Sequence, residues 1–225
     1  MEQNALKKKA TNFVCMKKRN KQTLFLRNKH SLFLRNNKIV CITGMPGAGK
    51  TLASEFFIKK GMLHLRFGQV VLDHLIKKGL AVNEKNERET REYLRKKHGM
   101  AAMAILNLPK LKALKQKRPV IADGLYSFDE FLILKKQFKQ DIVVISIYAP
   151  PHTRYKRLAK RKLVMGDKKA INRPLTKGEA ESRDLAELRN LDKGGTIAMA
   201  DYTVLNTKSK AFLYKQLDAT YKKIN

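Results

Sequence analysis

Residues 44–51 have the composition and spacing of a phosphate-binding loop. They read Gly-Met-Pro-Gly-Ala-Gly-Lys-Thr, which fits the pattern G-x-x-x-x-G-K-[ST], and they follow the apolar run 39–43 directly. Glycines let the backbone turn successive N–H groups toward an anion, and the start of a following helix adds partial positive charge. We expect Lys50 to bridge the β- and γ-phosphates of ATP and the Thr51 hydroxyl to ligate Mg²⁺. The residues expected to cradle the phosphates are Gly44, Met45, Pro46, Gly47, Ala48 and Gly49.

A second acid is needed for Mg²⁺, and the apolar run 120–122 ends in one, Asp123. A strand ending this way delivers its carboxylate to the carboxyl edge of a parallel sheet, beside the metal. The alternative is that Asp123 only ends a strand before the turn at Gly124. Motors and helicases commonly carry a water-activating Glu next to this Asp. Here Gly124 follows and no acid comes before Asp129, so hydrolysis is not expected to be the primary reaction.

Three arginines, Arg154, Arg157 and Arg161, recur at spacings of three and four after the run 142–148. This spacing predicts one face of a helix, and planar guanidinium groups suit the spread charge of a transferring phosphoryl group. A basic stretch containing Gly and Pro follows, with Arg173 inside it and Arg183 beyond it, and residues 162–176 are expected to form a mobile lid that excludes water. The alternative is a solvated basic helix.

The wider pattern alternates β-rich apolar runs with helical periodicity, which is typical of an α/β protein with a parallel sheet. Five strands are predicted at 39–43, 63–67, 119–123, 142–148 and 202–205. Helices are predicted at 49–60, 69–78, 87–97 continuing brokenly to 115, 129–138, 151–162, 177–191 and 209–223. The expected fold class is α/β, a three-layer P-loop NTPase fold with a five-stranded parallel sheet and a basic lid.

The charge of the chain is strongly positive, with a formal net charge of +30 over 225 residues. Residues 1–38 alone hold eleven Lys or Arg and one acid, Glu2, so we divide the chain into a basic extension, 1–37, and a domain, 38–225. The extension is expected to be a disordered or appended tail, and a start codon placed too early, with Met16 as the later candidate, would account for it. The alternatives are nucleic-acid contact and targeting. A phosphate-bearing partner explains the charge, and a solvated basic surface is the alternative.

Other features exclude several classes of protein. Two cysteines, Cys15 and Cys41, cannot form a disulfide framework, which suits a reducing, cytoplasmic compartment. The apolar runs are far shorter than the ~20 residues of a membrane helix, so no membrane partner is expected. The five histidines lack the spacing of a metal site, so we expect no metal other than Mg²⁺ carried with the nucleotide.

From residue 38 to the C-terminus the sequence resembles the nucleoside monophosphate kinase-like P-loop kinases. It is most similar to their dephospho-CoA kinase-like branch and, within it, to small archaeal nucleotide kinases. The motifs that carry this resemblance are 44–51, Phe-Gly-Gln-Val-Val at 67–71, Leu-Arg-Lys-Lys-His-Gly-Met at 94–100, Asp-Gly-Leu at 123–125, the run 149–161, and Ala-Asp-Tyr at 200–202 with Asn206.

The resemblance implies a helical substrate-binding section near residues 68–103 and roles for further residues. It places Arg157 and Arg161 at the start of the lid, with Arg157 binding the nucleotide, and Asn206 near adenine. The implied acceptor site consists of Gly68, Arg95, Gly124 and Arg183, the last on the helix beyond the lid. The family tends to carry arginines soon after the Gly-x-Val-Val stretch and after Asp-Gly-x, where this chain has Leu72 or Asp73, and Tyr126. These departures suggest a different acceptor or a protein that binds nucleotide without efficient transfer.

Three functions follow as hypotheses. The first is an enzyme, with Lys50, Asp123 and Arg161 as catalytic residues, that transfers the γ-phosphoryl of ATP to a small phosphate-bearing acceptor, either a nucleoside monophosphate or a dephospho-CoA-like compound. The second is a nucleotide-binding protein associated with RNA or DNA through its basic tail and surface. The third is a non-catalytic member of the fold.

Overall fold

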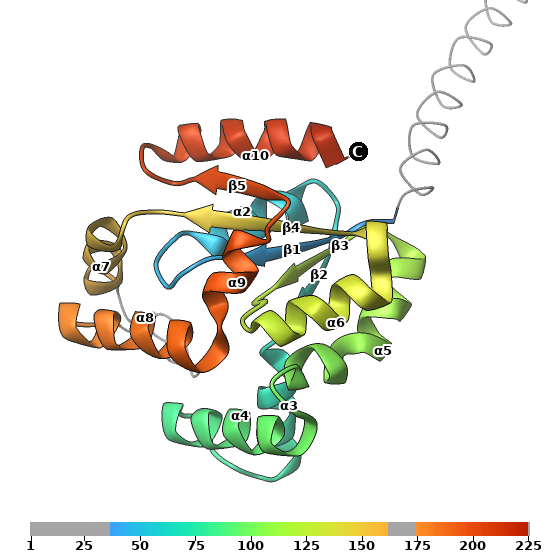
Figure 1. Ribbon diagram of the computed structural model, residues 1–225, viewed down its shortest axis with the longest axis vertical. Coiled ribbons are helices and arrows are strands. Elements are labelled where there is room, and N and C mark those ends of the chain that lie inside the picture. The colour runs from blue at the N-terminus through green and yellow to red at the C-terminus, as the bar shows by residue number, and fades with distance from the viewer. Residues whose placement is uncertain (1–36, 162–173, 225) are drawn as a thin grey trace, which may run out of the picture.

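The computed structural model describes residues 37–161 and 174–224 (Figure 1). The predicted extension and most of the predicted lid, including Arg173, lie outside the described residues. Within the described ranges, no helix is both long and apolar enough to cross a membrane.

Five parallel strands form one sheet in the order β2-β3-β1-β4-β5. They are β1 (Ile39–Thr43), β2 (Leu63–Arg66), β3 (Val120–Asp123), β4 (Ile142–Tyr148) and β5 (Tyr202–Leu205). The central strands read as continuous apolar runs because helices cover both faces of the sheet. The predicted fold class is confirmed, and each strand lies within one residue of its predicted bounds.

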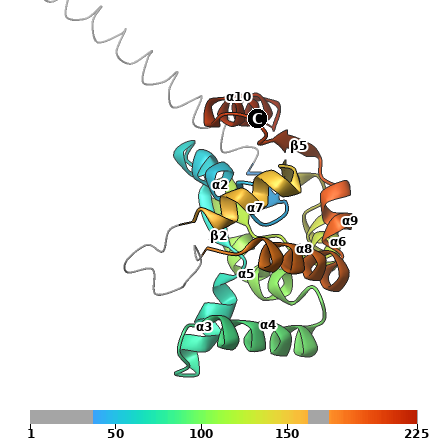
Figure 2. The ribbon, with the colours of Figure 1, turned by 90° about the vertical axis from the view of Figure 1, so that its left-hand side faces the viewer.

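Helices pack on both faces of this sheet and gather at its carboxyl edge (Figures 1 and 2). Nine α-helices are described: α2 (Lys50–Lys59), α3 (Gln69–Lys77), α4 (Glu84–His98), α5 (Ala102–Lys117), α6 (Phe128–Phe138), α7 (Pro151–Ala159), α8 (Lys177–Leu191), α9 (Lys193–Ala198) and α10 (Lys210–Ile224). A short 3-10 turn, η1 (Lys139–Asp141), joins α6 to β4.

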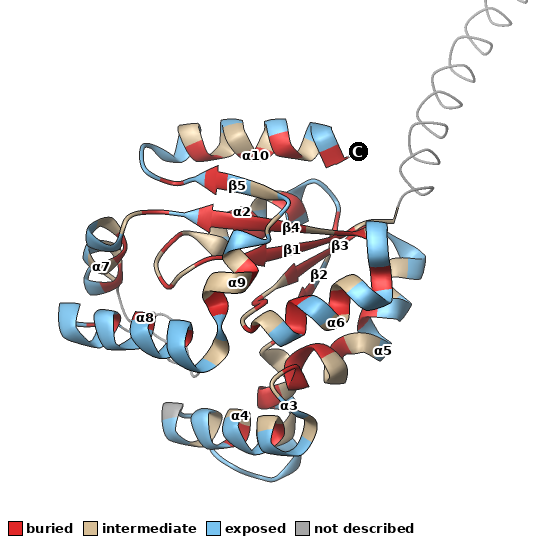
Figure 3. Cartoon of the chain, in the orientation of Figure 1, coloured by how far each residue is buried: buried red, intermediate tan, exposed pale blue. Residues whose placement is uncertain are grey.

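Strand β1 is buried along its whole length (Figure 3), and its side chains alternate between two parts of the core on the two faces of the sheet. Ile39 and Cys41 pack with α5 and α6, whereas Val40 and Ile42 pack with α2 and α10. Side chains of a strand point alternately to opposite faces, so a five-residue apolar run supplies both parts of the core. Packed between helices on both faces, the sheet holds the ends of its strands, and the loops that follow them, in fixed positions.

Several helix boundaries differ from the prediction. The broken helix predicted over 87–115 is two helices, because Gly99 adopts a left-handed φ of 79° after α4 and the chain restarts at α5. Helix α7 ends at Ala159, so Arg161 lies beyond it rather than on it. Helix α9, which has six residues, was not predicted.

Candidate functional site

The phosphate-binding loop joins β1 to α2, and its three glycines have the positive φ that such a loop requires. Gly44, Gly47 and Gly49 have φ values of 132°, 78° and 107°. A Cβ at Gly44 would lie 2.4 Å from the carbonyl oxygen of Ile147, and a Cβ at Gly49 would lie 2.2 Å from Nδ2 of Asn206. Both positions therefore exclude any side chain, for reasons of space as well as backbone conformation.

Lys50 begins α2 and turns back over the loop. Its Nζ donates hydrogen bonds to the carbonyl oxygens of Gly44, at 2.7 Å, and Met45, at 3.2 Å. Burial lowers the pKa of Lys50 to about 7, and the nearby cation of Lys193 lowers it further, while Glu187 and Asp123 oppose the shift. A buried cation with so little compensating charge favours an anion beside it.

The loop is held from β5 through Asn206. The Nδ2 atom of Asn206 donates to the carbonyl oxygen of Ala48 at 2.7 Å, and the backbone N–H donates to Tyr148 at 2.7 Å. Arg157, on α7, donates through Nη2 to the carbonyl oxygen of Asn206 at 2.8 Å. Asn206 and Arg157 therefore lie together at the loop, and the nucleotide-binding roles that the resemblance implied for both stay predictions.

Arg154 has a different role from the one its spacing suggested. It is buried, and its Nη1 and Nη2 atoms form a bidentate pair with Asp184 at 2.9 and 2.5 Å. Its Nε donates to Ala149, and Nη1 also donates to Pro46, each at 3.0 Å. The prediction that all three arginines form one phosphate-binding face is thus wrong for Arg154, because its guanidinium is buried and paired with Asp184 on α8.

The two predicted metal ligands lie at the same edge of the sheet. Asp123 ends β3 and pairs in register with Ile42 on β1, one residue before the strand gives way to the loop, and Thr51 lies in the first turn of α2. Among the described residues no group of three or more His, Cys, Asp or Glu could hold a metal. One hydroxyl and one carboxylate suit Mg²⁺, which keeps several waters and takes its other oxygens from phosphates.

On the side where the acceptor is predicted to bind, β2 ends in Arg66, which is paired in register with Asp123. The ideal Cβ of Gly68 lies 3.9 Å from Nε of Arg66, and Gly124 has φ 92° with its ideal Cβ 3.0 Å from the Tyr126 ring. Sequence reasoning missed Arg66, although a cation at the end of a parallel strand is a detectable signal.

Arg95, which was predicted to bind the acceptor, lies in the last turn of α4. Its Nε is buried, and no acceptor among the described residues reaches it. Burial lowers the pKa of this guanidinium, and the nearby Glu130 opposes that shift. Glu130 is itself fully buried; burial raises its pKa to about 7, although the backbone N–H of Tyr126 donates to it at 2.9 Å.

A buried group from α8 and α9 completes the charged surroundings of Lys50. The ammonium of Lys193 bonds to Glu187 and lies 4.6 Å from the centre of the Tyr126 ring. Glu187 also accepts from Nε of Arg183 at 3.2 Å, and the charge of Arg183 in turn acts on Arg161. Although burial opposes it, the charge of Lys193 holds the pKa of Glu187 below its ordinary value. The sequence had singled out neither Lys193 nor Glu187.

Comparison with known proteins shows which family this chain belongs to. A family model described as an AAA domain matches residues 40–186. A UPF0200 protein of Thermococcus gammatolerans is 34% identical over 188 residues, covering 83% of this chain and 95% of the relative. The chain belongs to the UPF0200 family.

Solved structures give this UPF0200 chain its fold relatives. Shikimate kinase from Acinetobacter baumannii in complex with shikimate has a TM-score of 0.53 at 19% identity, covering 86% of this chain and 96% of its own. A gluconokinase from Sinorhizobium meliloti has a TM-score of 0.50 at 11% identity, covering 84% and 94%. The P-loop kinase-like fold predicted by the resemblance is confirmed, whereas the dephospho-CoA kinase-like branch stays a prediction.

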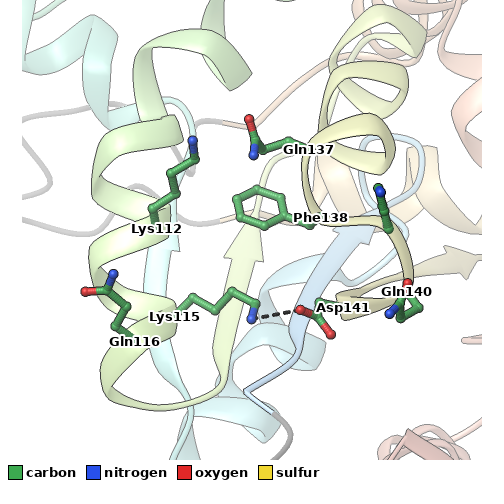
Figure 4. Close-up of a pocket in the computed structure, with 8 residues that line it drawn as sticks. Lys112, Lys115, Gln116, Gln137, Phe138, Gln140 and Asp141 are labelled. Carbon is green, nitrogen blue, oxygen red and sulfur yellow. Dashed lines mark ion pairs between the residues drawn. The ribbon is translucent and has the colours of Figure 1, made fainter.

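The hollow in Figure 4 lies elsewhere, between the ends of α5 and α6. It is lined by Lys112, Lys115, Gln116, Gln137, Phe138, Lys139, Gln140 and Asp141, and we name it the α5–α6 hollow. Strands β3 and β4 begin just after these helices, so the hollow lies at the amino edge of the sheet. The phosphate-binding loop follows the opposite, carboxyl edge.

Proposed function

We propose that this protein transfers the γ-phosphoryl group of ATP, with Mg²⁺, to a small phosphate-bearing acceptor such as a nucleoside monophosphate or a dephospho-CoA-like compound. The observation that carries the proposal is the convergence of cations from five separate elements or loops on the carboxyl edge of the sheet. They are Lys50, Arg66, Arg95, Arg183 and Lys193: the charges of Lys193 and Arg183 act on Lys50, and Arg66, Arg95 and Arg183 all interact electrostatically with Tyr126. A phosphate-binding loop alone supports nucleotide binding, and this surplus of cations supports a second anionic group beside it.

On the donor side, the loop would hold the phosphates through backbone N–H groups and Lys50. Lys50 would exchange its hydrogen bonds to Gly44 and Met45 for bonds to phosphate oxygens, which removes the cost of its buried charge. Thr51 and Asp123 would hold Mg²⁺, which neutralises charge between the β- and γ-phosphates when bound. Asn206 and Arg157 would keep the loop in shape through the bond to Ala48.

On the acceptor side, Arg66 and Arg95 would bind the anionic group of the acceptor. Guanidinium groups present paired donors that match two phosphate oxygens at once, and the buried Nε of Arg95 still has a donor to offer. Arg161 and Arg183 would lie nearer the transferred group, since the charge of Arg183 acts on both Lys50 and Arg161. In this arrangement the chain contributes position and charge, which is what phosphoryl transfer requires.

The test is acceptor-dependent formation of ADP from ATP and Mg²⁺ by the full-length protein. A panel of nucleoside monophosphates, dephospho-CoA and short RNA is compared with no acceptor. One small acceptor should raise the rate at least ~100-fold, and Lys50→Ala should abolish this stimulation because one transition-state contact is worth about 10²–10³. Lys59→Ala is the matched control, since Lys59 is exposed at the other end of the same helix.

Two results would contradict the proposal. Slow ATP hydrolysis that no acceptor stimulates would exclude transfer as the main reaction. Normal ATP binding without transfer to any member of the panel would instead favour the non-catalytic reading that Leu72 and Tyr126 first suggested.

A further inference from the structure

The amino edge of the sheet carries a concentration of positive charge that the proposed kinase site does not use. Helices α5 and α6 both end there, because β3 and β4 begin immediately after them. The described segments 110–118 and 136–141 hold seven Lys or Arg and one acid, Asp141. Lys38, at the start of β1, joins them through a hydrogen bond from Nζ to the carbonyl oxygen of Gln140 at 3.0 Å.

These cations surround the α5–α6 hollow, which has a volume of about 410 Å³. Figure 4 shows Lys112 and Lys115 on α5 facing Gln137 and Phe138 on α6 across it. The one acid is already neutralised, because Lys115 pairs with Asp141 at 2.9 Å. Lys112 and Lys139 are exposed at the hollow. The hollow therefore presents uncompensated positive charge together with three glutamine amides.

Helix dipoles account for only a part of this charge. The carboxyl end of a helix carries about half a negative charge, which one lysine offsets. Helix α5 has Lys115 and Lys117 in its last turn, followed by Arg118. Helix α6 has Lys136 in its last turn, followed by Lys139, whereas Lys135 in the same turn is paired with Asp201 at 2.9 Å. The excess beyond two helix ends is a positive surface that attracts a polyanion and repels other cations.

We propose that the α5–α6 hollow and its rim bind the phosphodiester backbone of a nucleic acid. Lysines neutralise phosphates by releasing their counterions, and glutamine side chains add hydrogen bonds to phosphates and sugars. An anionic membrane fits less well, because none of the exposed large apolar side chains of the described residues lies in segments 110–118 or 136–141. This inference is independent of the proposed kinase activity, since it rests on residues at the opposite edge of the sheet.

The test uses the full-length protein and two double variants with the same charge change. Lys112→Glu/Lys139→Glu alters the hollow, and Lys77→Glu/Lys78→Glu alters two exposed lysines at the end of α3. Residues 1–36, which are also basic in sequence, are present in every protein compared. Binding of labelled single-stranded RNA, double-stranded RNA and single-stranded DNA is measured by fluorescence anisotropy over a range of NaCl concentrations. Vesicles containing phosphatidylserine, and polyglutamate, are measured in parallel.

We expect the hollow variant to bind nucleic acid at least ~10-fold more weakly at about 100 mM salt, with the slope of log K against log salt reduced by about 2. The nucleic-acid affinity of the α3 variant should stay within about twofold of that of the parent protein if contacts at the hollow, rather than net charge, determine binding. Comparing the three nucleic acids identifies which one the surface prefers. ATP affinity and thermal unfolding, measured on all three proteins, should be unchanged, because these lysines are exposed and remote from the loop.

Three outcomes would overturn the proposal. If both double variants bound nucleic acid equally more weakly than the parent protein, net charge alone would account for the binding. No detectable binding of any nucleic acid by the parent protein would remove the partner. Binding to the vesicles or to polyglutamate that is stronger than nucleic-acid binding, and that only the hollow variant loses, would assign the surface to a different partner.

Discussion

Lys50 is a residue whose charge depends on what lies in the loop around it. Its ammonium is part-buried and donates to the carbonyl oxygens of Gly44 and Met45, and burial lowers its pKa to about 7. The charged groups that act on it come from three elements: Asp123 from β3, Arg183 and Glu187 from α8, and Lys193 from α9. A bound triphosphate adds negative charge beside it and raises its pKa again. Nucleotide binding is therefore linked to the uptake of a proton by Lys50.

The sign of this linkage predicts how ATP affinity depends on pH. Below pH 7 Lys50 is already protonated in the free protein, so affinity should be highest there. Above pH 7 the free protein loses a proton that the complex keeps, and affinity should fall by up to about tenfold per pH unit. Isothermal titration in two buffers of different ionisation enthalpy measures both the affinity and the proton uptake.

Lys50→Arg is the control for this prediction, because a guanidinium stays charged throughout the range. Its ATP affinity, although lower overall, should vary little with pH. An unchanged affinity of the parent protein from pH 6.5 to 9, with no proton uptake, would contradict the linkage.

Single residues also show how far the site could be predicted from the sequence. The roles assigned within residues 44–51 depend on local spacing, so the loop, its glycines and the direction of Lys50 follow from the motif. Arg66 lies more than a hundred residues before Glu187 and Lys193 in the sequence. The strand order places Arg66 beside Asp123, and the turn between α8 and α9 brings Glu187 and Lys193 close enough to act on Lys50. Neither arrangement is encoded in a local pattern.

At the scale of elements, one buried ion pair connects α7, α8 and the phosphate-binding loop. Arg154 on α7 pairs with Asp184 on α8 and also donates to the carbonyl oxygen of Pro46 inside the loop. Tyr155 donates its hydroxyl to the same Asp184 at 3.0 Å. Because Asp184 is the partner that neutralises Arg154, the position of α8 and the shape of the loop depend on one carboxylate.

Removing the Asp184 carboxylate should therefore destabilise the protein strongly, because a buried guanidinium loses its counterion. Asp184→Ala leaves the Arg154 guanidinium buried without a counterion, and such losses cost about 3–5 kcal/mol of unfolding free energy. Glu181→Ala, an exposed position on the same helix, should change stability by less than about 0.5 kcal/mol. Urea unfolding followed by circular dichroism measures both. A loss below about 1 kcal/mol for Asp184→Ala would mean that Arg154 finds other acceptors.

Helices and strands with a clear local sequence pattern were predicted correctly, and those without one were missed. All five strands were found within a residue. The central strands β1, β3 and β4 are mostly buried and contain long apolar runs, whereas the edge strands β2 and β5 are partly exposed and carry polar residues such as His64 and Thr203. Helix α9 has six residues, two of them Gly194 and Gly195, and this length is too short for a periodic apolar face. The arginine spacing on α7 identified a helix correctly but could not show that Asp184, thirty residues later, would take Arg154 into the interior.

At the scale of the whole molecule, positive charge gathers at both ends of the strands. Cations around Lys50 occupy the carboxyl edge of the sheet, and the cations of the α5–α6 hollow occupy the amino edge. Parallel strands with antiparallel helices create this arrangement, because one edge collects helix starts and the loops after strands, and the other collects helix ends. A molecule with a formal charge of +30 then carries strong self-repulsion in the absence of anions.

This repulsion predicts that added salt stabilises the folded protein. The screening length falls from about 30 Å at 0.01 M to about 10 Å at 0.1 M, which is short enough to separate the two edges electrostatically. Thermal unfolding by circular dichroism should therefore show Tm rising by a few degrees between about 0.01 and 0.1 M NaCl, and rising less beyond that range. The Lys77→Glu/Lys78→Glu variant, with lower net charge and no change at either edge, should show a smaller rise. A Tm that falls with salt would mean that attractive pairs such as Lys60–Asp218 and Lys135–Asp201 outweigh the repulsion.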